Sequence, residues 1–135
     1  MQTDSPDIQV GGFSLWVPGS QGDEDGWLSV TARYQDPHCR ICVEGAYLQV
    51  NDLWRFHDEL LAMNDSLRGS ALLAGHEPNL SLAIAMKGQG RAEAQLRLTP
   101  DHLHSLHEIR FALDQSHFPA LLRASRALCR RIPLR

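Results

Sequence analysis

The hydrophobic pattern of residues 106–131 changes its period once, and this change restricts the fold more than any other feature of the chain. Ile109, Phe111 and Leu113 alternate with polar or small side chains, a spacing typical of a strand with one buried face. Beyond residue 116 the apolar side chains fall on one face of a helix. The sequence therefore predicts a strand that leads directly into a closing amphipathic helix.

Three polar residues, Asp114, Gln115 and Ser116, stand between this strand and this helix. Polar side chains at such a junction accept hydrogen bonds from the first backbone N–H groups of a helix. We therefore interpret them as a junction and cap, and not as an active site. His117 beside the junction and His57 in an earlier helical segment are interpreted as packed or capping histidines.

The same alternation recurs in earlier segments, separated by turn residues. A slip in its phase near the middle of one segment predicts a β-bulge at Gly45. Between the strands, helical spacing predicts one helix that is capped by Asn51 and Asp52 and ends near Asn64. The predicted strands span residues 13–17, 27–34, 39–50, 67–74, 80–87 and 91–99.

Together these elements predict an α+β fold. We expect an antiparallel sheet of about six or seven strands, open or strongly curved, with two amphipathic helices packed on one face. A chain of 135 residues is long enough for one core, so we expect a single domain over residues 13–135. Residues 1–12 are mostly polar and end in two glycines, which predicts a flexible N-terminus.

Charge and hydropathy restrict the class of partner. The net charge of −3 argues against general nucleic-acid binding, which normally requires a basic surface. No apolar run approaches the roughly 20 residues that cross a bilayer, and the chain begins without a charged-then-apolar leader. We therefore expect a cytoplasmic protein that binds neither nucleic acid nor membranes.

Cys39 and Cys42 form a C-x-x-C pair, a spacing found in redox sites and in zinc sites. A redox pair of the thioredoxin type lies at the start of a helix, and a structural zinc site needs two further ligands. Cys129, however, lies far along the closing helix. On a strand the two side chains of the pair point to opposite faces, so we interpret both as ordinary structural cysteines.

His102, His104 and His107 form the densest group of potential metal ligands, with Asp101 and Glu108 nearby. Converging neutral imidazoles would bind a transition metal and would point to a metal-dependent enzyme. The alternative, which we favour, is a solvated polar loop. No nucleotide-binding, metalloprotease or nucleophile motif occurs at a meaningful position, so we expect no catalytic residue, no cofactor and no bound metal.

Residues 20–26 form a polar loop that contains three adjacent carboxylates, Asp23, Glu24 and Asp25. One interpretation of such a charge run is a solvated loop. The other is an acidic patch that faces a protein partner.

Several motifs follow one another over most of the chain, and as an ordered set they resemble the bacterial immunity proteins of the WapI type. In this resemblance Trp27 opens a strand after the acidic loop. Asp114, Gln115, Ser116 and Pro119 match the closing strand, its Asp-Gln-Ser/Thr signature and the closing helix. The motifs are DEDGWL (23–28), NDLWRF (51–56), GSAL (69–72), NLSL (79–82) and FALDQSHFP (111–119).

The resemblance implies a protein that binds and blocks the toxic C-terminal domain of a contact-delivered polymorphic toxin, often a nuclease, inside the producing cell. Such a protein acts by steric and electrostatic occlusion and performs no chemistry of its own. The acidic balance agrees with this role, because nuclease toxins tend to be basic where they hold RNA or DNA. The alternative is a small scaffold or homo-oligomeric domain that associates through exposed strand edges.

Overall fold

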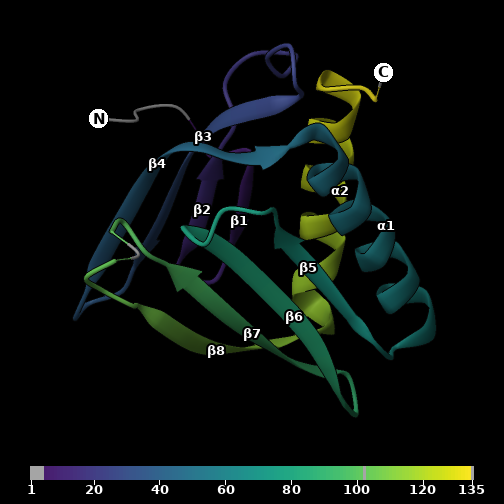
Figure 1. The fold of residues 1–135 in the computed structure, drawn as a ribbon. Helices are drawn as coiled ribbons and strands as arrows, with labels where there is room; N and C mark the ends of the chain where they lie inside the picture. Colours follow the sequence, from purple (N-terminus) through teal and green to yellow (C-terminus); the bar gives the residue numbers. More distant parts are fainter. Residues whose placement is uncertain (1–4, 102, 135) are drawn as a thin grey trace.

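Two antiparallel sheets of four strands each face one another, and two helices lie together at one side of them (Figure 1). This computed structural model describes residues 5–101 and 103–134. The first sheet contains β1 (Ile8–Val10), β2 (Phe13–Trp16), β3 (Trp27–Gln35) and β4 (Arg40–Gln49), in that order. The second contains β5 (Ser70–Ala74), β6 (Leu80–Gly88), β7 (Arg91–Leu98) and β8 (Glu108–Asp114), also in that order. The helices are α1 (Val50–Ser66), the short 3-10 helix η1 (Gln115–His117) and α2 (Phe118–Arg131).

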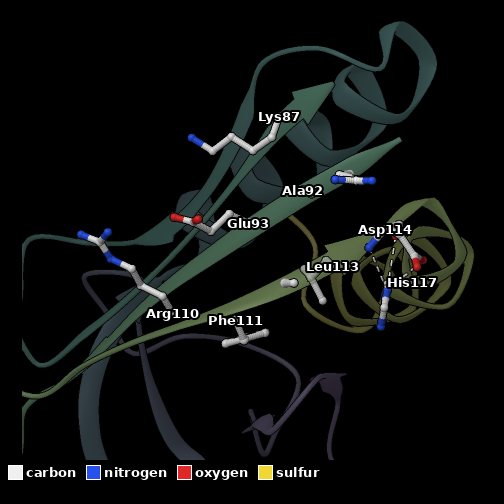
Figure 2. Close-up of a pocket in the computed structure, with 10 residues that line it drawn as sticks. Lys87, Ala92, Glu93, Arg110, Phe111, Leu113, Asp114 and His117 are labelled. Carbon is white, nitrogen blue, oxygen red and sulfur yellow. Dashed lines mark hydrogen bonds and ion pairs between the residues drawn. The ribbon is translucent and has the colours of Figure 1, made fainter. Parts of the chain in front are cut away.

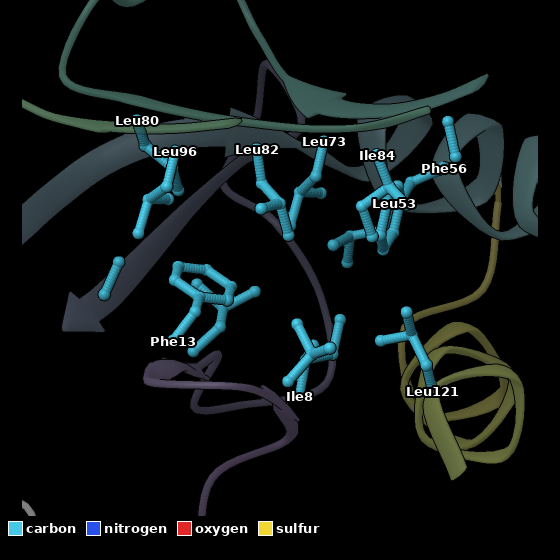
Figure 3. Packing of buried hydrophobic residues seen from close by; sticks show 14 of the residues in the cluster. Ile8, Phe13, Leu53, Phe56, Leu73, Leu80, Leu82, Ile84, Leu96 and Leu121 are labelled. Atoms are coloured by element: carbon cyan, nitrogen blue, oxygen red, sulfur yellow. The ribbon is translucent and has the colours of Figure 1, made fainter. Parts of the chain in front are cut away.

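The core lies between the inner faces of the two sheets and is closed by the helices (Figure 3). Leu82 and Ile84 from the second sheet point towards Phe13 and Ile8 from the first. All four side chains are buried. Along β6 these buried side chains alternate with partly exposed ones, which explains why the sequence pattern located that strand.

The two helices pack against each other and against the outermost strands of the sheets. α1 contacts β5, and α2 contacts β1. The Cys129 thiol lies 3.7 Å from the Leu53 carbonyl, and the Trp54 indole N–H donates to the Ile132 carbonyl at 3.0 Å. The start of α1 therefore lies beside the end of α2. Neither helix in the described part of the chain combines the length and the apolarity that spanning a bilayer requires.

The predicted fold class is confirmed, and the single sheet is not. β4 and β5 do not pair with each other, and α1, which lies between them in the chain, leads from the first sheet to the second. The strand count is therefore eight in the described residues, slightly above the expected number. Alternation reports which face of a strand is buried, but it carries no information on which strand pairs with which.

The prediction of a flexible segment over residues 1–12 is wrong for its second half. Ile8 and Val10 form the short edge strand β1, which pairs with Leu15 and Phe13 of β2. Both side chains are buried in the core. The strand was missed because two apolar residues in a polar context are too few to show a period. Residues 1–4 lie outside the described part of the chain.

Two local predictions also need correction. The bulge lies at Tyr47, where the β3–β4 register shifts, and Gly45 is regularly paired with Val30. Helix α1 begins at Val50, before the predicted cap residues Asn51 and Asp52, and its N-cap residue is Gln49. Asp52 belongs to the cap, because its carboxylate accepts the Gln49 backbone N–H at 2.7 Å.

The helix–helix contact contains a buried histidine. His57 is 8% exposed, and its Nδ1 lies 2.7 Å from the hydroxyl of Ser125, which is 2% exposed. Desolvation and, next, the positive charge of Arg126 lower the pKa of His57, while Asp58 opposes this shift. The expectation of a packed histidine is confirmed.

We therefore predict that the protein loses stability as pH falls below about 6.5, the pKa of histidine in an unfolded chain. The unfolded state binds a proton at His57 before the folded state does, so acid favours unfolding until the lowered folded pKa is passed. Urea unfolding measures the free energy of unfolding at pH 7.5 and at pH 5.5. Between these two pH values this free energy should fall less in His57→Gln than in the parent protein. The matched variant His76→Gln, in an exposed loop, should behave as the parent. Equal losses for all three proteins would contradict the prediction.

Candidate functional site

The acidic loop, residues 20–26, joins β2 to β3 and is shaped by the first of its carboxylates. Oδ1 of Asp23 accepts the backbone N–H groups of Asp25 and Trp27, both at 2.9 Å. The Asp23 backbone N–H in turn donates to the Trp27 carbonyl at 2.8 Å. Asp23 therefore holds the turn, and Glu24 and Asp25 remain exposed to solvent.

Two glycines allow the loop to close on itself. A side chain at Gly22 would lie 2.6 Å from the backbone of Gly26, and Gly26 has a φ of +82°, which favours glycine. The closed loop is fastened to the start of α1, where the Val50 backbone N–H donates to the Gly26 carbonyl at 3.1 Å. The Gln49 side chain adds a bond to the Asp25 carbonyl at 3.3 Å.

Between this loop and the start of α1 lies a hollow of about 240 Å³. Glu24 and Asp25 line it together with Asn51. Neither carboxylate belongs to any of the ion pairs within the described residues. The loop therefore presents two unneutralised negative charges on a backbone that is fixed at both ends, an arrangement suited to contact with a basic surface.

A larger hollow, of about 500 Å³, lies over the end of the β7–β8 pair (Figure 2). Figure 2 shows Lys87, Glu93 and Arg110 on one side of the strands and Phe111 on the other. The charges around the hollow have both signs, and Arg110 lies 3.5 Å from a carboxylate oxygen of Glu108. This mixture gives the hollow no clear preference for an anion or a cation.

The strand–helix junction beside that hollow is a cap, as predicted. Oδ1 of Asp114 accepts hydrogen bonds from the Ser116 backbone N–H at 2.9 Å and from the Ser116 hydroxyl at 2.5 Å. The bond from the hydroxyl is the main reason why the pKa of Asp114 is lowered. The Asp114 backbone N–H donates to His117 Nδ1 at 3.1 Å. The Gln115 backbone N–H donates to the Gly90 carbonyl, in the turn between β6 and β7, at 3.0 Å. Pro119 lies in the first turn of α2. These contacts join β8 to α2 and show that Asp114 and Ser116 form a cap at the junction.

The histidine group falls partly outside the described residues, because His102 does. His104 Nδ1 lies 2.6 Å from Asp101 Oδ2 in an exposed loop, and His107 is half-buried at the end of that loop. Within residues 5–101 and 103–134, no group of three or more His, Cys, Asp or Glu side chains is arranged to hold a metal ion. The structure thus assigns no metal ligands among the described residues of this loop.

The three cysteines are free thiols in different surroundings. Cys42 is exposed on β4, Cys39 is half-buried, and Cys129 is buried between the helices. Burial raises the pKa of the Cys129 thiol to about 11, so this thiol stays protonated at neutral pH. Cys39 directly precedes β4, which begins at Arg40 and not at Cys39 as expected, so only Cys42 of the pair lies on the strand.

We predict that a maleimide reagent modifies Cys42 in the folded protein and leaves Cys129 unmodified, because the thiolate is the reactive form. Mass spectrometry of the digested protein measures both positions. Denaturation in urea before labelling should make Cys129 reactive and so serves as the control. Rapid labelling of Cys129 without denaturant would show that the two helices separate readily.

Comparisons with known proteins agree with the resemblance seen in the sequence. The model of the Immunity protein WapI-like family matches residues 6–133. No curated protein matches the chain. A chain in a solved structure described as the CdiA-CT/CdiI toxin and immunity complex from Enterobacter cloacae matches 87% of this chain over 99% of its own length. The identity is 10% and the TM-score is 0.44, so this second match adds nothing to the family match.

Proposed function

Because the chain belongs to the Immunity protein WapI-like family, we propose that it binds the toxic domain of a polymorphic toxin and blocks it in the cytoplasm of the producing cell. The family match over residues 6–133 is the observation that carries this proposal. The toxin domain is proposed to be a nuclease, whose basic substrate-binding surface would be complementary to an acidic chain with a net charge of −3.

The acidic loop is the proposed point of contact. Glu24 and Asp25 are exposed, belong to no ion pair of the described residues, and stand on a loop that Asp23 and the start of α1 hold in place. A fixed loop loses little conformational freedom on binding, which favours affinity. Oppositely charged surfaces also accelerate the encounter of the two proteins.

The proposed mechanism is occlusion without a chemical step. The imidazole and hydroxyl of His57 and Ser125 lie within hydrogen-bond distance, as in some nucleophilic sites, but both side chains are buried between α1 and α2. A substrate would have to separate the helices to reach this pair. The exposed carboxylates of the acidic loop instead offer a surface that covers a basic one.

Co-expression with any toxin-like domain encoded beside the gene tests the proposal. Cells that carry an inducible copy of that domain should stop growing, and the present chain should restore growth. An unrelated toxin of the same enzymatic class is the control, and the chain should give no protection against it. Growth arrest that persists with every adjacent toxin domain, although the chain is expressed and folded, would contradict the proposed function.

A further inference from the structure

The solvent face of α2 carries a row of arginines without any carboxylate. Arg123, Arg126 and Arg130 are exposed and follow one another at spacings of three and four residues, so they lie on one side of the helix. We call these three residues the arginine face. No Asp or Glu occurs between Phe118 and Arg131. In a chain with a net charge of −3, this helix is a concentrated region of positive charge.

The arginine face does not serve the fold through ion pairs. None of the ion pairs in the described residues includes Arg123, Arg126 or Arg130. Arg131 shows the contrast, because its guanidinium lies 2.9 Å from Asp7 and donates to the Val17 carbonyl. That arginine fastens the end of α2 to the first sheet, whereas the other three take part in no ion pair with the rest of the described chain.

Helix stability does not explain the arginine face either. Cations stabilise the last turn of a helix through the helix dipole, but this effect fades within one turn. It accounts for Arg130 and leaves Arg123 and Arg126 without an explanation. Like charges four residues apart on a helix repel each other, and a glutamate at one of these positions would be favourable. The absence of such a residue from α2 points to a role outside the folded chain.

We propose that the arginine face binds an acidic surface of a protein partner. The three side chains extend over about 10 Å of helix, at a rise of roughly 1.5 Å per residue. Carboxylates that recur every three or four residues on a partner helix would match this spacing. Guanidinium groups form two parallel hydrogen bonds with a carboxylate, so each position offers a strong contact.

A protein surface fits better than a nucleic acid. The rest of the chain is more acidic than the net charge of −3, because α2 contributes only positive charges. That acidity repels a long phosphate backbone, whereas a partner segment of limited length touches only the arginine face. None of the three arginines lines either of the two hollows described above, so the face suits an extended contact and not a small anion.

Fluorescence anisotropy with a synthetic peptide tests the proposal. The probe is a labelled helical peptide of about 18 residues with glutamates every three or four positions, and the same peptide with glutamines is the reference. At roughly 20 mM ionic strength the glutamate peptide should bind at least about tenfold more tightly than the glutamine peptide. The variant with Arg123→Gln, Arg126→Gln and Arg130→Gln should lose at least about tenfold in affinity.

Matched variants separate charge from folding. Arg123→Lys, Arg126→Lys and Arg130→Lys together keep the charge and should retain binding within a few-fold. The variant Glu24→Gln/Asp25→Gln should bind the peptide at least as well as the parent chain. Salt at roughly 0.3 M should weaken binding of the parent chain, and this result does not depend on the folding of any variant.

Several results would overturn the proposal. These are failure to bind the glutamate peptide, equal binding by the glutamine triple variant, and loss of binding in the lysine triple variant. Single-stranded RNA that binds more tightly than the peptide, through the same arginines, would assign the face to nucleic acid instead. Light scattering at low salt could instead show a dimer of the parent chain. If the glutamine triple variant and Glu24→Gln/Asp25→Gln both lose this dimer, the arginine face binds a second copy of this chain.

Discussion

Replacement of Phe56 by alanine is expected to lower the free energy of unfolding by roughly 3–5 kcal/mol. The Phe56 side chain is 0% exposed and extends from α1 into the core between the two sheets (Figure 3). Its removal leaves a cavity that the surrounding strands fill only in part, so both the burial of the ring and its contacts are lost. Chemical unfolding followed by circular dichroism measures the change.

Leu61→Ala on the same helix is the control, because Leu61 is 37% exposed. Its cost should be at most about 1 kcal/mol, since little buried surface is lost and alanine favours a helix.

We also propose that the two sheets and both helices form one domain. Circular dichroism and tryptophan fluorescence should then report the same unfolding transition. Similar costs for the two variants, or two separate transitions, would contradict this description of the core.

Charge reversal in the acidic loop is expected to weaken toxin binding by roughly tenfold to a hundredfold. The variant Glu24→Lys/Asp25→Lys places two positive charges where the proposed partner is basic, so attraction becomes repulsion. Both side chains are exposed, and the fold should therefore be unchanged. Association rates measured at low and high salt should show that most of the difference disappears as salt increases.

Asp58→Lys/Asp65→Lys is the matched variant for this experiment. It makes the same change in net charge at two exposed positions of α1, and it should weaken binding by less than a few-fold. Circular dichroism confirms that both variants are folded. Equal loss of affinity in the two variants would show that net charge alone governs the encounter and that the acidic loop is not the contact.

Much of the fold could be predicted from hydrophobic periodicity. The strands β2, β3, β6, β7 and β8 lie close to their predicted positions, because each directs apolar side chains at alternate positions into or against one core. The switch of period near Asp114 correctly located the junction between β8 and the closing helix. These features are local, since the pattern that reveals each one is contained in a few consecutive residues.

The arrangement of the strands could not be predicted in this way. The division into two sheets depends on where α1 leads the chain after Gln49, and no local pattern contains that information. Strand β1 has two inward side chains, Ile8 and Val10, which is too short a run to establish alternation. Its stability comes from pairing with β2 and from packing against the core, both of which are tertiary effects.

The candidate sites, like the fold, could be predicted from the sequence only in part. The sequence located the acidic loop, but it treated three carboxylates as equivalent, although Asp23 is occupied by hydrogen bonds within the loop. That difference depends on the turn geometry of the folded chain. The arginine face was visible in the sequence as a helical segment without Asp or Glu and was overlooked. Only the structure shows that Arg131 is paired and that Arg123, Arg126 and Arg130 are not in the ion pairs of the described residues.

The most direct test is a titration of a purified toxin domain encoded beside the gene with the purified chain, with the proposed nuclease activity of that domain as the readout. We predict that activity falls linearly and is abolished at one equivalent of the chain, because occlusion requires one bound molecule for each toxin. Removal of the chain by denaturation and refolding of the toxin should restore activity. Full activity in the presence of excess chain, or inactivation by far less than one equivalent, would contradict a binding protein that acts by occlusion.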